Sequence, residues 1–175
     1  MRETTKPATE KEESKKIALV TGANSGMGKA TAAALADLGF QVVMLCRNKA
    51  RAEAAKKELE QVAGRALHLM LCDLASMNDI RKFTDEFKSI FPRLDVLVNN
   101  AGVISLKRRL TKDGLEEQFG VNHIGHFLLT LRLIDIMKPG TRIVVVASGA
   151  HKIGRIHFND INLKWGYNAV TAYSQ

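Results

Sequence analysis

The sequence predicts an α/β fold, a doubly wound parallel sheet with helices packed on both faces. Three observations predict it. Short apolar runs alternate with helical segments along most of the chain, the first apolar run ends in a glycine-rich turn, and the spacing leaves room for a helix in each connection. At 175 residues, the chain can bury roughly 70% of its unfolded surface, so one domain can hold its own core.

The first expected elements are a strand, a helix and a second strand. Residues 17–20 form a short apolar run that is typical of a buried parallel strand. Residues 29–38 have alanine at most positions and are followed by Gly39, so they predict a helix that stops at this glycine. Residues 41–46 are apolar and β-branched, and they predict the second strand.

A second helix and a third strand come next. Asn48 is placed to cap the helix, which we expect to run to about Val62 and to end at Gly64. Residues 66–72 then predict the third strand.

The following helix and strand have clear boundaries. Ser76 is placed to cap a helix over residues 76–90, and Pro92 lies beyond its end. Residues 94–98 predict the fourth strand.

The last predicted elements are a long helix and a fifth strand. We expect residues 111–137 to be mostly helical, with Pro139 and Gly140 closing the helix. Residues 141–147 predict the fifth strand. After it we expect loop as far as Tyr173.

The glycine turn after the first strand and right-handed crossovers favour a Rossmann arrangement with strand order 3-2-1-4-5. A flavodoxin-like order satisfies the alternation alone equally well. Residues 1–15 have no apolar periodicity and are rich in Lys, Glu and Thr, so we expect a disordered polar tail. Residues 16–175 are expected to form one nucleotide-binding domain.

Composition excludes several classes of protein. The two cysteines, Cys46 and Cys72, are too few for a disulfide scaffold or a structural zinc site, and we expect free buried thiols. No apolar run reaches the roughly 20 residues of a membrane helix, and no secretory signal is apparent. We therefore expect no membrane span and a reducing, cytoplasmic setting.

Charge and histidine spacing suggest neither nucleic acid nor metal. The net charge of +8 is not gathered into one tract, so we expect a solvated basic surface and no nucleic-acid partner. His123 and His126 are spaced as metal ligands can be, but no third ligand lies nearby in the sequence. We expect no metal site.

The segment Thr21-Gly-Ala-Asn-Ser-Gly-Met-Gly28 has the spacing TGxxxGxG and joins the first strand to the first helix. Glycines at such a turn let a pyrophosphate approach the backbone and the helix N-terminus.

Further motifs give this turn a family context. Asn99-Asn-Ala-Gly102 follows the fourth strand, Asn122 lies in the long helix, Ser148 follows the fifth strand, and Tyr173 comes 25 residues later. In this order and spacing, residues 16–175 resemble the short-chain dehydrogenase/reductase family. Three fragments resemble its retinol-dehydrogenase-like branch: Cys46-Arg-Asn48, Ser148-Gly-Ala-His151 and Gly154-Arg-Ile-His-Phe158.

The resemblance implies hydride transfer between a nicotinamide cofactor and an alcohol or carbonyl carbon. Tyr173 would exchange the proton, Ser148 would orient the substrate oxygen, and Asn122 would hold a water that relays protons. The implied cofactor-binding residues are Gly22, Asn24, Ser25, Gly26, Met27, Gly28, Arg47, Asn48, Asp73, Leu74, Asn99, Ala101 and Gly102. Asp73 could instead only cap its local turn.

The residue at the end of the second predicted strand favours NADP over NAD as the cofactor. A carboxylate there would bind the ribose hydroxyls of NAD, but Arg47 occupies the place and can pair with a 2′-phosphate. Arg47 could instead be a solvated charge. Lys29 could add positive charge or serve only the helix surface.

One expected residue is missing. The family's catalytic lysine follows the tyrosine by four positions, whereas Tyr173 is followed only by Ser174 and Gln175. The resemblance also implies a homo-oligomer built with the helix that begins near Tyr173, which we expect to be impaired here. An apolar edge at residues 143–146 is expected to favour association.

Three hypotheses remain open from the sequence. The chain is an NADP-dependent oxidoreductase acting on a small alcohol or carbonyl compound of lipophilic, retinoid- or steroid-like character. Alternatively, it is a nucleotide-binding module without turnover. In the third, it is a truncated piece of a longer reductase.

Overall fold

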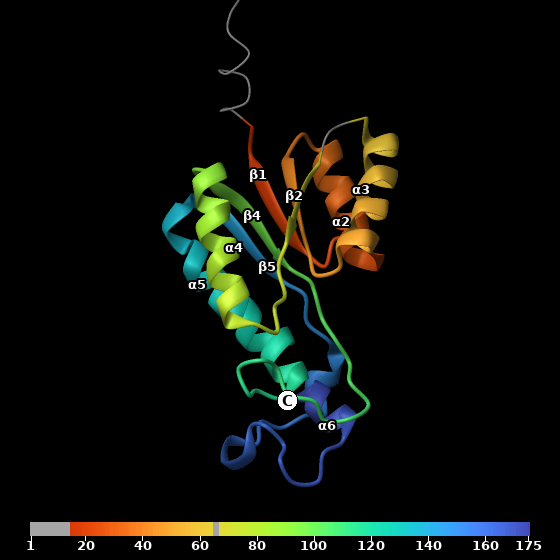
Figure 1. The fold of residues 1–175 in the computed structure, drawn as a ribbon, viewed down its shortest axis with the longest axis vertical. Helices are drawn as coiled ribbons and strands as arrows, with labels where there is room; N and C mark the ends of the chain where they lie inside the picture. Colours follow the sequence, from red (N-terminus) through yellow and green to blue (C-terminus); the bar gives the residue numbers. More distant parts are fainter. Residues whose placement is uncertain (1–14, 65–66) are drawn as a thin grey trace, which may run out of the picture.

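The structure is a computed structural model that describes residues 15–64 and 67–175. The polar tail expected at residues 1–15 therefore lies, except for Lys15, outside the described residues. Figure 1 shows a central sheet between two pairs of helices, with a smaller lobe built from the segments that follow β4 and β5.

The predicted fold is confirmed. Five strands form one parallel sheet in the order β3-β2-β1-β4-β5. The strands are β1 (Ile17–Thr21), β2 (Gln41–Cys46), β3 (His68–Leu71), β4 (Leu94–Asn99) and β5 (Met137–Val145). The flavodoxin-like order is thereby excluded.

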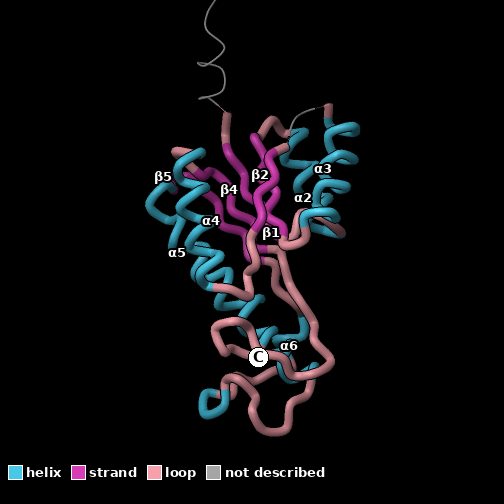
Figure 2. Tube along the Cα trace, in the orientation of Figure 1, coloured by secondary structure: helices cyan, strands magenta, loops and turns pink. Residues whose placement is uncertain are grey.

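Helices cover the two faces of the sheet, as Figure 2 shows. They are α2 (Gly26–Asp37) and α3 (Lys49–Ala63) on one side, and α4 (Met77–Ile90) and α5 (His126–Leu133) on the other. The predicted caps are present, because Asn48 Oδ1 accepts from Arg51 N and Ser76 Oγ accepts from Asp79 N.

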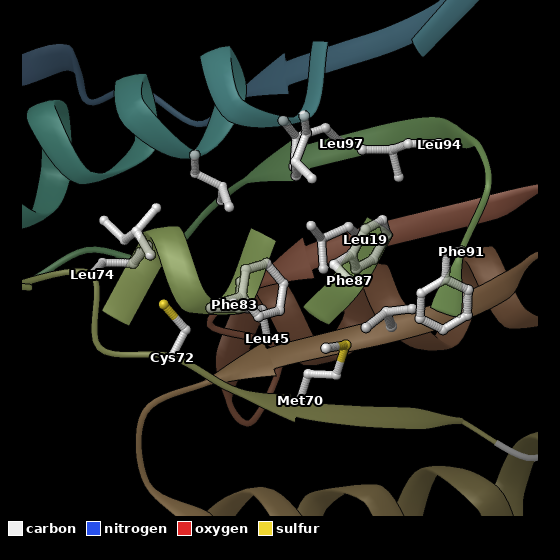
Figure 3. Close-up of a cluster of buried hydrophobic side chains, with 14 of the residues drawn as sticks. Leu19, Leu45, Met70, Cys72, Leu74, Phe83, Phe87, Phe91, Leu94 and Leu97 are labelled. Atoms are coloured by element: carbon white, nitrogen blue, oxygen red, sulfur yellow. The ribbon is translucent and has the colours of Figure 1, made fainter. Parts of the chain in front are cut away.

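Two cores result from the alternation of side chains along the strands. Beneath α4, Leu19 and Leu45 pack with Phe83 and Phe87, as Figure 3 shows. On the other face, smaller residues such as Ala18 and Val20 meet the alanines of α2. Small residues on both sides let α2 lie close to the sheet beside the glycine turn.

The long helix expected over residues 111–137 begins later than predicted. Residues 111–115 form a turn, in which Thr111 Oγ1 accepts from Leu115 N, and Gly114 has a φ of +78°. Helical backbone follows as a π-helical segment, η1 (Phe119–Gly125), then α5, then the 3₁₀ turn η2 (Ile134–Ile136). The turn chemistry of Thr111 and Gly114 overrides the helical pattern of the sequence.

The start of β5 also differs from the prediction. The strand begins at Met137 rather than at residue 141 and includes Pro139 and Gly140. A register shift absorbs the extra residues, because Leu94 pairs with Met137 whereas Val96 already pairs with Arg142.

The segment after β5 holds three short helical pieces rather than only loop. They are η3 (Gly149–Lys152), η4 (Phe158–Asp160) and α6 (Ala169–Ser174). Asn168 Oδ1 accepts from Val170 N and Thr171 N, and this cap starts α6 before Tyr173. The segment packs on the loop after β4, since Arg108 Nε donates to the carbonyl of Asn162.

No helix within the described residues is long and apolar enough to cross a bilayer.

Candidate active site

A cavity of about 410 Å³ opens at the carboxyl ends of β1, β2 and β4, beyond the end of β3. In parallel α/β sheets, ligands bind outside this edge, where the strand order reverses. Here the order reverses between β1 and β4, and the glycine turn after β1 forms one wall of the cavity.

The glycine turn is shaped by contacts that only glycine allows. Gly22 has a φ of +67°, and a Cβ there would lie 3.0 Å from Ala101 Cα. A Cβ on Gly28 would overlap Asn100 Nδ2 and the carbonyl of Gly22. The first turn of α2 therefore packs directly against the loop after β4, which leaves its N-terminus facing the cavity.

Ser25 precedes α2 without using its side chain as a cap. Its hydroxyl and the first N–H groups of the helix are therefore placed to meet an anion.

Cys46 supports the turn from β2. The backbone of Ala23 and Asn24 lies against the thiol and acts to lower its pKa. Burial, the larger effect, raises the pKa of the Cys46 thiol to about 11. Burial, with help from Asp79 and Asp73, raises the pKa of the Cys72 thiol to about 12. Both thiols are free, and they belong to the cores on opposite faces of the sheet.

Two arginines line the cavity where β2 ends. Arg47 follows the strand and precedes the Asn48 cap, whereas Arg51 lies in the first turn of the adjoining α3, and both line the cavity. Arg51 was missed in the sequence because its role depends on the position of the Asn48 cap. Lys29, by contrast, pairs with Glu58 on α3 and does not line the cavity.

The segment after β3 forms another wall. Asp73 and Leu74 both line the cavity. Asp73 Oδ1 also accepts from Ala75 N, and its carbonyl accepts from Ser76 N. The turn-capping role and a position on the cavity wall are therefore combined in Asp73.

Of the cofactor-binding residues predicted from the sequence, all but Gly26 and Asn99 line the cavity. Asn99 is the last residue of β4, and its Nδ2 donates to Thr130 Oγ1 on α5. Its neighbour Asn100, which was not predicted, lines the cavity and donates through Nδ2 to the carbonyl of Thr21. Successive side chains of a strand point to opposite faces, which explains the exchange of roles.

The predicted catalytic Asn122 lies within the π-helical segment. Its Oδ1 accepts from Val103 N at 2.8 Å, and its Nδ2 donates to the carbonyl of Val103 at 3.0 Å. The side-chain amide thus holds the loop after β4. A π-helical segment is common at functional sites because it re-aims backbone groups.

Tyr173 and Asn122 line a second cavity of about 130 Å³. Apolar side chains make much of its wall: Phe119, Ile156, Ile161 and Ala172. Ser148 lies outside this wall; its Oγ accepts from Ala150 N and caps η3, which packs against α6. The structure therefore places Tyr173 and Asn122 together, with Ser148 on the adjoining segment.

The two histidines of η1 and α5 do not converge. The His123 ring stacks between Phe119 and Phe127, whereas the His126 ring contacts Thr21. Among residues 15–64 and 67–175, no group of His, Cys, Asp or Glu side chains is arranged to hold a metal.

Comparisons with known proteins agree with this geometry. The family profile described as short chain dehydrogenase matches residues 16–160. Retinol dehydrogenase 14 of Mus musculus is 47% identical over 173 residues, which cover 91% of this chain and 52% of that protein. Polyprenol dehydrogenase of Homo sapiens is 40% identical over 167 residues, with 91% and 51% covered.

Solved structures give the same fold. An uncharacterized protein from Mycobacterium paratuberculosis is 38% identical with a TM-score of 0.82, covering 91% of this chain and 56% of that one. A short chain dehydrogenase from Escherichia coli CFT073, complexed with NADPH, is 22% identical with a TM-score of 0.71, covering 91% and 64%. The chain spans about half the length of the relatives it matches. It belongs to the short chain dehydrogenase family.

Proposed function

We propose that this chain binds NADP and contributes to an oxidoreductase that interconverts an alcohol and a carbonyl compound. The observation that carries the proposal is the cavity at the carboxyl edge of the sheet, where the glycine turn and N-terminus of α2 face Arg47 and Arg51. A dinucleotide needs anion-binding backbone for its pyrophosphate, and NADP also needs cations for its 2′-phosphate.

The residues fit such a cofactor. The close approach at Gly22 and Gly28 leaves backbone, rather than side chains, along the cavity wall. Arginines can form paired hydrogen bonds with a phosphate, whereas a carboxylate at the end of β2 would repel it. When bound, the nicotinamide supplies or accepts a hydride.

Side chains of this protein would transfer the proton to or from the substrate oxygen. Tyr173 lines the second cavity together with Asn122, and its hydroxyl would give a proton to a substrate oxygen or take one from it. Tyrosine ordinarily has a pKa of about 10, so the reaction needs a nearby positive charge to favour the phenolate. Ser148 would contribute by rotating its hydroxyl from the η3 cap toward the substrate oxygen.

The walls of the second cavity favour a lipophilic substrate. Phe119, Ile156 and Ile161 offer apolar surface in the cavity that Tyr173 also lines. Relatives at 40–47% identity are named for retinol and polyprenol, which are lipophilic alcohols. We also propose a reducing cytoplasmic setting, in keeping with two free thiols.

Binding without turnover is the second candidate function. Two observations favour it: the Asn122 amide is engaged by the Val103 backbone, and the Ser148 hydroxyl caps η3. Titration with NADPH followed by an absorbance assay at the nicotinamide band, with a panel of lipophilic aldehydes, separates the two. Binding with oxidation of NADPH supports the enzyme; binding alone supports the second function.

The arginine contacts give a direct test of cofactor choice. Arg47→Ala and Arg51→Ala should each weaken NADPH binding roughly tenfold or more, because each loses a charge-assisted hydrogen bond to the 2′-phosphate. NADH binding should change little. Fluorescence titration of both cofactors measures the two affinities.

Lys29→Ala is the matched control, because Lys29 is a nearby cation that pairs with Glu58 outside the cavity. It should leave both affinities unchanged. Equal affinities of the unaltered chain for NADH and NADPH would overturn the preference for NADP.

A further inference from the structure

His126 is a buried titratable side chain that the proposed mechanism does not use. It begins α5, is 5% exposed, and lies between the end of β1 and the π-helical segment. Its Nε2 is 2.9 Å from Thr21 Oγ1, and its Nδ1 is 3.1 Å from the carbonyl oxygen of Asn122. Both ring nitrogens therefore have a partner.

These partners fix one tautomer of the ring. A carbonyl oxygen only accepts, so Nδ1 carries the hydrogen that it donates to Asn122. In the neutral ring, Nε2 is then an acceptor, and the Thr21 hydroxyl donates to it. The lone pairs of Thr21 Oγ1 accept from Asn100 N and Ala101 N, each at 2.8 Å.

Every donor and acceptor position of the Thr21 hydroxyl takes part in a hydrogen bond. Its oxygen accepts two backbone hydrogen bonds, and its single hydrogen has two acceptors within reach, His126 Nε2 at 2.9 Å and the more distant carbonyl of Val98 at 3.4 Å. The shorter contact assigns the hydrogen to His126, and the residue is fully buried. A fully satisfied buried network holds its members in one arrangement, and the loss of one partner strands the others.

Three segments of the site meet at this network. Thr21 starts the glycine turn, Asn100 and Ala101 line the cofactor cavity, and Asn122 lines the second cavity. Ala101 is also the residue that approaches Gly22. One imidazole thus links the loops expected to hold the cofactor to the helix expected to serve the proton transfer.

We propose that His126 is a positioning residue that, as a neutral Nδ1–H imidazole, fixes the Asn100–Ala101 loop against the glycine turn and orients the carbonyl of Asn122. The cofactor part of this inference rests on the proposed NADP function. The ring acts through Thr21 and Asn122 and touches neither cavity wall itself.

Two amide substitutions separate the two hydrogen bonds of the ring, the one with Thr21 and the one with the carbonyl of Asn122. In His126→Gln, the side-chain amide reaches the position of Nε2, so its oxygen can still accept from Thr21. In His126→Asn, the amide nitrogen reaches only the position of Nδ1, so it can still donate to Asn122. His126→Phe keeps a ring of similar shape and removes both hydrogen bonds, and Thr21→Val removes the hydroxyl.

NADPH affinity, measured by fluorescence titration, tests the hydrogen bond between His126 and Thr21. His126→Asn, His126→Phe and Thr21→Val should each bind NADPH about tenfold more weakly, as the loss of a buried hydrogen bond predicts. His126→Gln should retain affinity within about threefold of the unaltered chain. Titration is done well below each variant's thermal midpoint, so that all variants are folded.

A second readout is independent of the cofactor. Nitrogen chemical shifts of the His126 ring in the unaltered chain should show a protonated Nδ1 and an unprotonated Nε2 at neutral pH. The opposite tautomer, or a charged ring, would overturn the inference. Equal loss of thermal stability in all four variants with unchanged NADPH affinity would reduce His126 to a packing residue and overturn it too.

Failure of the proposed NADP function would give different results from failure of the proposed role of His126. If the unaltered chain binds no NADPH while the ring shows the expected tautomer, the hydrogen-bond network stands but its link to the cofactor is overturned. If the unaltered chain binds NADPH and His126→Gln loses as much affinity as His126→Phe, the NADP function stands and the role of His126 is overturned.

Discussion

Cys46 ends β2, and Cys72 comes directly after the neighbouring β3 and donates its N–H to the carbonyl of Cys46. Their side chains nevertheless lie on opposite faces of the sheet. A disulfide between them is therefore excluded by the alternation of strand side chains. The sequence places both cysteines at strand ends, but only the fold shows which core each one enters.

These thiols predict a loss of stability at alkaline pH. The unfolded thiols ionise near pH 9, whereas burial raises the folded pKa of Cys46 to about 11 and that of Cys72 to about 12. The protonated thiols stabilise the fold fully below pH 9, and this contribution is lost as the pH rises through 9 toward the folded values. Urea unfolding midpoints should fall as the pH rises from about 9 toward about 11.

The control is the double variant Cys46→Ala and Cys72→Ala, which removes both titrating groups. Its midpoint should fall less steeply over the same range, even if the variant is less stable throughout. An unchanged slope would show that other groups cause the alkaline loss.

Gly28 predicts a steric effect at the cofactor cavity. Gly28→Ala places a methyl group against Asn100 Nδ2 and the carbonyl of Gly22. The crowding should destabilise the fold by about 1–3 kcal/mol and reduce NADPH affinity, because the α2 N-terminus must shift. Thermal unfolding and NADPH titration measure the two effects.

Gly149→Ala serves as the comparison, since a Cβ at Gly149 meets nothing within 4 Å and its φ is not positive. Gly149→Ala should change neither the stability of the fold nor the NADPH affinity appreciably. A tolerated Gly28→Ala with full NADPH affinity would contradict the close packing of α2 on the loop after β4.

At the scale of elements, the fold was largely predictable because strand and helix periods differ clearly. The caps at Asn48 and Ser76 and the stop at Gly64 follow local chemistry that sequence alone shows. The late start of the helical segment at η1 could not be predicted in this way. Besides the turn at Thr111 and Gly114, this start depends on Glu116, a residue type that is not a usual cap and that acts here because the fold buries it completely.

Glu116 therefore predicts a stability effect. Its Oε1 accepts from Gln118 N and its Oε2 from Phe119 N, so one carboxylate satisfies two free donors at the helix start. Glu116→Gln replaces an acceptor oxygen with a donor and removes the charge that favours a helix N-terminus. Urea unfolding should show a loss of about 1–2 kcal/mol.

Glu86→Gln makes the same chemical change on the exposed surface of α4 and should alter stability by less than about 0.5 kcal/mol. Equal effects of the two substitutions would mean that the Glu116 cap adds nothing beyond net charge.

At the scale of the whole molecule, the topology explains why some site residues were predictable and others were not. The carboxyl ends of parallel strands meet at one edge, so residues such as Arg47, Asp73 and Ala101 could be brought together from the sequence. Arg51 and Asn100 required the fold, because helix phase and strand parity decide which side chain faces the cavity. The relation of Ser148 to Tyr173 depends on short helical pieces that have no strong periodic signal.

The same topology leaves β5 at an edge of the described sheet, paired only with β4. The exposure expected at residues 143–146 is confirmed, and Val145 is 66% exposed. Pro139 blunts the start of the edge, because it has no N–H to donate, but the apolar end of the strand has no such protection. An exposed helical stripe on α5, which includes Phe127 and Leu131, adds further apolar surface.

This edge predicts self-association that rises with protein concentration. Light scattering on the unaltered chain should show species larger than a monomer, and Val145→Lys should shift the distribution toward the monomer, because a charge on an edge strand opposes pairing. Leu38→Lys places the same charge on an apolar residue at the end of α2, which is also exposed, and should leave association unchanged. A monodisperse monomer at all concentrations, or equal effects of the two lysines, would show that the edge of β5 does not drive association.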